Sequence, residues 1–159
     1  MEKIIHNISR MNTQETFVKL LEDGIPMLFT AAKAMPADKF DWKPEETSRS
    51  AHQLVVECIT MLALSAGFLT TREMPSYEEE SARYEGKSVE ELEKMGKENA
   101  EKLYKAIRAF PDADLGVSVE LPWGKSTFFQ AMSYPYWNIM WHTGQLNYIQ
   151  TLYGDTDFR

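Results

Sequence analysis

Four stretches of the chain carry apolar residues at helical spacing, and polar or proline-containing segments separate them. The i, i+3, i+4 recurrence predicts helices over residues 13–34, 48–71, 88–110 and 127–153. Each stretch has an apolar face that needs a partner, and helices of this length bury such faces against one another. We therefore expect an all-α fold, a four-helix bundle formed by one domain that spans residues 1–159.

Local signals agree with these helices. Pro26 and Pro135 fall inside the first and last patterns, where each removes a backbone donor, so we expect a bend within each helix. Gly154 follows the last pattern as a stop. Residues suited to capping precede the first three helices, namely Asn12 or Thr13, Ser48 or Ser50, and Ser88.

The connections differ in character. Residues 35–50 contain Phe40 and Trp42, so we expect this loop to pack onto the bundle. Residues 72–86 are polar and acidic and indicate a solvated loop. Alternating apolar residues around Trp123 and Gly124 predict a short extended segment or hairpin before the last helix.

Charge and composition exclude some classes of partner. The net charge is −7 and the pI is about 5.0, which argues against nucleic acid and against anionic membrane surfaces. We find no signal peptide, and we expect no apolar stretch that approaches the roughly 20 residues of a membrane span. The single cysteine, Cys58, cannot form an internal disulfide, which favours the cytoplasm.

Several families of catalytic and binding motifs are absent from the sequence. It contains no glycine-rich phosphate-binding pattern, no GxSxG nucleophile elbow and no CxxC pair. The chemistry of the chain must therefore be sought in its buried polar residues.

The last predicted helix carries a polar ladder beside its apolar stripe. Asn138 and His142 are one turn apart on one face, and Gln145 continues the line. Gly144 costs about 1 kcal/mol in a helix, and such a glycine indicates that another backbone approaches closely. Trp137 and Trp141 either line a pocket with Gln145, pack in the core or form a dimer face.

Glu57 is the second candidate, because it interrupts an apolar helix and has no basic residue three or four positions away. Metal sites in bundles use inward side chains from facing helices, so Glu57, His142 and Asn138 are candidate ligands. Alternatively, Glu57 lies in water at the bundle end or accepts a hydrogen bond from His142 or Trp141.

The remaining chemistry-bearing side chains have simpler interpretations. Cys58 points about 100° away from Glu57 around the helix and is expected in the core. We expect His52 to be exposed and His6 to be solvated in the leader.

Three stretches in order resemble the DinB superfamily, which includes YfiT-like proteins and thiol-dependent transferases. They are residues 40–59 (FDWKPEETSRSAHQLVVECI), the helix 88–110 with its following extended segment, and residues 137–154. The last is the most specific, because family members commonly end with two histidines four apart, one further residue and Gly-Gln-Leu. Residues 142–146 (HTGQL) match that ending.

The resemblance implies a four-helix bundle with an up-up-down-down-like arrangement, a long crossover and frequent homodimers. Many members bind a divalent metal such as nickel or zinc through three histidines. Here the matching positions are Glu57, Asn138 and His142, so a degenerate triad is implied. A carboxylate and an amide make such a site harder, which weakens nickel or zinc binding relative to manganese, magnesium or calcium, or leaves no cofactor at all.

Two functions of different class follow. The first is a metal-dependent hydrolase or thiol S-transferase acting on an unknown small substrate, with a metal that activates water or a thiol. The alternative is a non-catalytic small-molecule binding or structural dimeric module that has lost the metal. In both cases we expect a cytoplasmic homodimer.

Overall fold

Four long helices form the body of the molecule in the computed structural model, which describes residues 12–157. They are α1 (Thr13–Lys33), α3 (Ala51–Thr71), α5 (Val89–Ala109) and α6 (Phe128–Leu152). Their ends differ from the predicted ends by at most three residues. The all-α bundle is thus confirmed, and α1 and α6 continue through Pro26 and Pro135.

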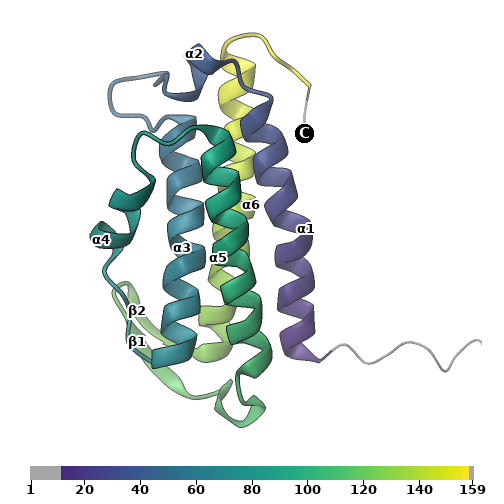
Figure 1. Cartoon of the computed structure of the whole chain (residues 1–159), viewed down its shortest axis with the longest axis vertical. Helices are drawn as coiled ribbons and strands as arrows, with labels where there is room; N and C mark the ends of the chain where they lie inside the picture. Colours follow the sequence, from purple (N-terminus) through teal and green to yellow (C-terminus); the bar gives the residue numbers. More distant parts are fainter. Residues whose placement is uncertain (1–11, 158–159) are drawn as a thin grey trace, which may run out of the picture.

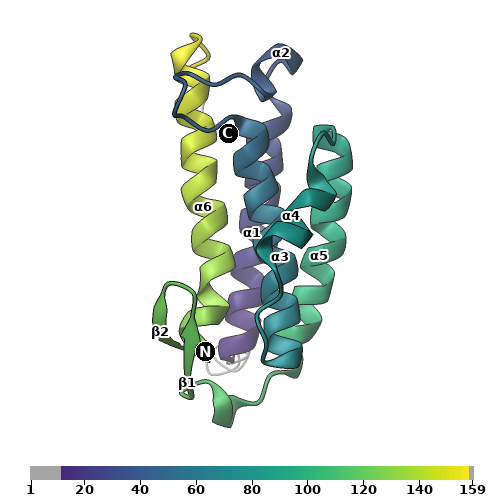
Figure 2. The ribbon, with the colours of Figure 1, turned by 90° about the vertical axis from the view of Figure 1, so that its left-hand side faces the viewer.

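The helices form a square in which α1 and α3 each pack between α5 and α6 (Figure 1). Figure 1 shows α1 and α6 running up the bundle and α3 and α5 running down. The order along the chain is therefore up, down, down, up, which corrects the up-up-down-down-like arrangement. The long crossover is the connection of residues 72–88 between α3 and α5, which returns along the outside of the bundle (Figure 2).

Side chains next to each helix start fix where the helix begins. Asn12 caps α1, since its side-chain oxygen accepts a hydrogen bond from the Glu15 backbone N–H at 2.9 Å. The other three long helices begin with reciprocal capping boxes, which satisfy two backbone donors each. These boxes are Ser50 with Gln53, Ser88 with Glu91, and Thr127 with Gln130.

The helix α3 is apolar enough, by length and composition alone, to cross a membrane. The expectation that the sequence lacks such a stretch is therefore wrong. Most of this helix is buried against α5 and α6, and the core helix of a bundle has the same composition as a membrane span.

The connections carry more structure than the sequence indicated. The 35–50 segment contains the one-turn helix α2 (Ala37–Phe40), and Trp42 packs edge-on against Tyr153, which confirms that this loop lies on the bundle. The 72–86 segment is not a plain solvated loop, because it forms α4 (Tyr77–Ser81) and the 3-10 turn η2 (Ala82–Tyr84).

Tyr84 anchors this crossover. Its side chain is 1% exposed, and its hydroxyl accepts a hydrogen bond from the Asn99 side chain of α5 at 2.7 Å and donates to Glu80. A buried hydroxyl needs such partners, so the contact ties the crossover to α5.

A second 3-10 turn, η3 (Asp112–Asp114), follows α5. The predicted hairpin comes next, with β1 (Ser118–Leu121) antiparallel to β2 (Gly124–Thr127) and Leu121 opposite Gly124. Gly124 has a φ of 127°, a region that suits glycine at this turn.

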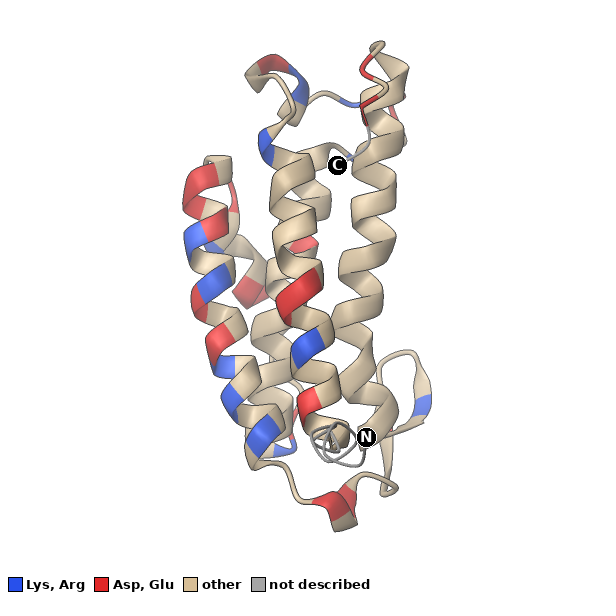
Figure 3. Ribbon diagram, turned by 90° about the vertical axis from the view of Figure 1, so that its right-hand side faces the viewer, with Lys and Arg blue, Asp and Glu red and all other residues tan. Residues whose placement is uncertain are grey.

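Charge is distributed unevenly over the helices. The outer face of α5 alternates acidic and basic residues, whereas α6 contains no Lys, Arg, Asp or Glu (Figure 3). His142 is the titratable side chain of this helix that is buried against α3, so the outer side of the helix offers only uncharged side chains to solvent.

Candidate functional site

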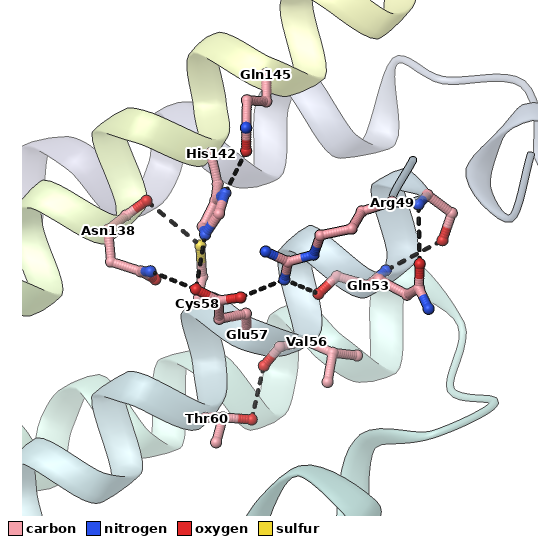
Figure 4. Close-up of polar contacts among 10 residues, drawn as sticks. Arg49, Gln53, Val56, Glu57, Cys58, Thr60, Asn138, His142 and Gln145 are labelled. Atoms are coloured by element: carbon pink, nitrogen blue, oxygen red, sulfur yellow. Dashed lines mark hydrogen bonds and ion pairs between the residues drawn. The ribbon is translucent and has the colours of Figure 1, made fainter. Parts of the chain in front are cut away.

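Three predicted residues meet between α3 and α6. Glu57 Oε1 lies 3.0 Å from His142 Nε2 and accepts a hydrogen bond from Asn138 Nδ2 at 2.9 Å (Figure 4). The His142 side chain is 5% exposed and that of Glu57 is 24% exposed. The alternative in which Glu57 bonds to His142 is thus the observed contact.

The second carboxylate oxygen of Glu57 has a partner that sequence reasoning missed. Arg49 Nη2 forms an ion pair with Glu57 Oε2 and also donates to the Gln53 carbonyl at 3.4 Å. Arg49 precedes the cap residue Ser50, and its side chain reaches along the first turns of α3 (Figure 4). Arg49 lies eight residues before Glu57, whereas ion pairs within a helix are expected at a spacing of three or four residues.

This surrounding lowers the pKa of Glu57 from 4.5 to about 2. The hydrogen bond from His142 is the largest cause, burial opposes it, and the Asn138 bond and the charges of His142 and Arg49 add to the lowering. Glu57 is consequently an ionised acceptor near neutral pH.

The contacts of His142 fix one of its protons. A carboxylate only accepts hydrogen bonds, so Nε2 of His142 carries the hydrogen that it donates to Glu57. Nδ1 lies 2.6 Å from Gln145 Oε1, and this contact is complete when Nδ1 is also protonated.

These residues do not fit the divalent metal that the resemblance implies. A metal-bound imidazole must offer a free lone pair, yet the Nε2 of His142 is a donor here. The Arg49 guanidinium places a positive charge where a cation would bind Glu57, and Asn138 presents its nitrogen rather than its oxygen. Among residues 12–157, no three His, Cys, Asp or Glu side chains come together as a metal-binding group.

The three residues predicted to line a pocket, Trp137, Trp141 and Gln145, do not lie in one pocket. Trp137 and Trp141 are 69% and 70% exposed on α6, so they do not enclose a cavity, which corrects that interpretation. The bulky side chains lie on the outer side of a helix whose inner side is already filled by Ile139, His142 and Leu146.

Gln145, by contrast, lines a cavity of about 750 Å³ at the end of the bundle. We call it the bundle-end pocket; it lies between the 42–49 loop, α3 and the C-terminal half of α6. Its wall consists of Trp42, Pro44, Glu45, Thr47, Ser48, Arg49, Leu54, Gln145, Tyr148, Ile149 and Leu152. Arg49 and Gln145 thus belong both to this pocket and to the polar contacts around Glu57 and His142.

Two other candidates lie outside the pocket. Cys58 is fully buried, and burial raises the pKa of its thiol, so it is a core residue as expected. The side chain of His52 is 12% exposed, which corrects the expectation of exposure, because it packs edge-on against Phe40. His6 lies outside the described residues.

No family model and no curated protein sequence matches the chain. Among solved structures it is similar to a DinB-like protein, YjoA, from Bacillus subtilis, at 20% identity over 91% of this chain and 96% of that chain, with a TM-score of 0.67. It is also similar to the mycothiol-dependent maleylpyruvate isomerase, at 15% identity over 84% of this chain and 60% of that chain, with a TM-score of 0.63. These likenesses show that the fold is DinB-like.

Proposed function

We propose that this DinB-like chain is a metal-independent protein that binds a small molecule in the bundle-end pocket. The observation that carries the proposal is the occupation of both Glu57 oxygens by donors of the chain itself, from Arg49, Asn138 and His142. The residues that replace a metal-binding triad thereby bond to one another through Glu57, while Asn138 Oδ1 stays buried without a hydrogen-bond partner among the described residues. The pocket beside it has the volume and mainly apolar wall of a small-molecule site.

We expect protein purified without chelator and without a histidine tag to contain far less than one metal per chain. Incubation with nickel, zinc or manganese followed by a chelator should leave the melting temperature unchanged, because an ion that does not bind the native state cannot stabilise it. Elemental analysis and a thermal melt measure this. Near-stoichiometric metal that is lost in His142→Ala would contradict the proposal.

Binding in the pocket can be tested by ligand-observed NMR with a library of small fragments in the presence of chelator. Trp42→Ala removes an aromatic wall residue, so we expect fragment binding to be lost in this variant. Trp123→Ala is the matched control, since Trp123 is 55% exposed on the hairpin at the other end of the bundle. If no fragment binds wild type, or Trp42→Ala and Trp123→Ala behave alike, the small-molecule function fails.

A metal-assisted hydrolase or thiol S-transferase is the second candidate. The likeness of the fold to the mycothiol-dependent isomerase is the observation that favours it, although the chain spans about 60% of that protein. This function would require Arg49 to leave Glu57 and His142 to give up its donated hydrogen bond. Metal-dependent turnover of a thiol-containing substrate would establish it.

We further propose a cytoplasmic homodimer formed through the α6 aromatic face, defined as Trp137, Trp141 and Tyr148. These side chains are 65–70% exposed on a helix without charged residues. Gly144 lies between Trp141 and Tyr148 along the helix, and apart from the adjoining backbone of α6 no atom of the described chain comes within 4 Å of the position that its Cβ would take. We expect Trp141→Glu to convert a dimer into a monomer in analytical ultracentrifugation, whereas Glu120→Gln on the hairpin should not; a wild-type monomer would refute the proposal.

A further inference from the structure

The bundle-end pocket has an uneven distribution of polar groups. Arg49 is its basic residue and Gln145 its amide, while apolar and aromatic side chains make much of the remaining wall. Glu45 is the acidic residue of the wall and is exposed. Arg49 and Gln145 supply the donors of the pocket wall, and the same two side chains also bond to Glu57 and His142, respectively.

Arg49 has unused hydrogen-bonding capacity at this wall. Its contacts with Glu57 and Gln53 both run through Nη2, and within residues 12–157 Nη1 and Nε have no hydrogen-bond partner. Both two-nitrogen edges of a guanidinium include Nη2, so the donors left on Nη1 and Nε can each give a single hydrogen bond to an oxygen of a carboxylate. The side chain is 44% exposed, so these free donors can be reached from solvent.

Gln145 adds a donor to the same wall. Its Oε1 is taken by His142 at 2.6 Å, so its Nε2 is the group left to hydrogen-bond elsewhere. No hydrogen-bond partner for that Nε2 occurs in the described part of the chain. An anionic group would therefore meet donors from both Arg49 and Gln145.

The rest of the wall favours an apolar body. Leu54 and Ile149 form a buried floor, and Trp42 and Tyr148 present aromatic surface to the same cavity. A molecule with a flat or aliphatic body and one acidic end would satisfy both parts of the pocket. Because the protein has a net charge of −7, such an anion depends on the local donors rather than on the long-range field.

We propose that the bundle-end pocket recognises a small carboxylate with an apolar body, and that a free N–H of Arg49 and the amide N–H of Gln145 bind the carboxylate oxygens. This inference rests on the proposed small-molecule function and names its ligand class. Arg49 remains paired with Glu57 through Nη2 while its other nitrogens contact the ligand.

Two probes of equal size test this charge preference, namely 4-phenylbutyrate and 4-phenylbutyramide in isothermal titration calorimetry. We expect wild type to bind the acid about tenfold more tightly than the amide, as one exposed charge-assisted pair allows. Arg49→Gln should abolish this difference. Glu57→Gln is the matched control: it disturbs the same network but leaves the guanidinium, so the preference for the acid should persist.

Equal affinity of acid and amide, or an acid preference that survives in Arg49→Gln, would overturn the carboxylate assignment. If neutral fragments still bind in a Trp42-dependent way, the small-molecule function stands and the ligand class alone is wrong. If inorganic phosphate displaces 4-phenylbutyrate at equal concentration, the pocket binds anions in general, which also overturns the assignment to carboxylates. Failure of all fragments to bind would reject the proposed function itself.

Discussion

Replacing Gly96 with alanine is expected to destabilise the protein by about 1–2 kcal/mol, although alanine is the better helix former. Gly96 lies in α5 where the helix meets α1 and α3. A Cβ there would come within 2.9 Å of both the Ile59 Cγ2 and the Phe29 Cζ atoms. Both side chains are fully buried, so neither can move aside without disturbing the core.

Gly144→Ala is the matched control for this prediction, because it makes the same chemical change in the interior of another long helix. Among residues 12–157, and apart from the adjoining backbone of α6 itself, no atom lies within 4 Å of the added methyl, so the expected close approach of another backbone is wrong. The gain in helix propensity should therefore stabilise the chain by about 0.5–1 kcal/mol. Urea unfolding of dilute protein measures both changes. A stabilised Gly96→Ala variant would contradict the tight packing at Gly96, and a destabilised Gly144→Ala variant would contradict the open surroundings of Gly144.

Glu57→Gln should lower the free energy of unfolding by about 2 kcal/mol at neutral pH, and this difference should disappear in acid. The lowering of the Glu57 pKa from 4.5 to about 2 corresponds to at most about 3 kcal/mol, and the partial exposure of the side chain reduces that figure. A depressed native pKa gives stability that is fully present above the unfolded value of 4.5. It is lost progressively as the pH falls from 4.5 towards about 2.

The measurement is a series of urea titrations of wild type and variant across that pH range. Glu120→Gln provides the control, since the Glu120 side chain is 71% exposed and lies 3.9 Å from Lys125. A surface pair of this kind contributes little. If the free energy of unfolding of Glu57→Gln stays below that of wild type by the same amount down to pH 2, the loss arises from altered packing and not from the lost charge.

The bundle could be predicted because its signals are local. Ser88, for example, lies three residues before Glu91, and this spacing marks the start of α5 through hydrogen bonds between neighbouring residues alone. The convergence of Glu57, Asn138 and His142 could also be predicted, because each polar residue interrupts a periodic apolar face.

The parts that could not be predicted depend on how side chains extend. Arg49 reaches Glu57 from outside the helix, so helical spacing gives no sign of the pair. Trp137 and Trp141 share a helix with buried residues, and a helix with polar and aromatic residues on every side does not reveal which side faces solvent. Tyr84 is buried by a crossover whose composition is that of a solvated loop.

The lack of charge on α6 has a consequence for the behaviour of concentrated solutions. Molecules with a net charge of −7 repel one another at low ionic strength, and the side of the molecule formed by α6 contributes nothing to that repulsion. Added salt screens the repulsion between the charged sides but does not weaken contacts between tryptophan side chains. The encounter of two molecules through α6 is therefore directional, and added salt favours it by screening the repulsion between the charged sides.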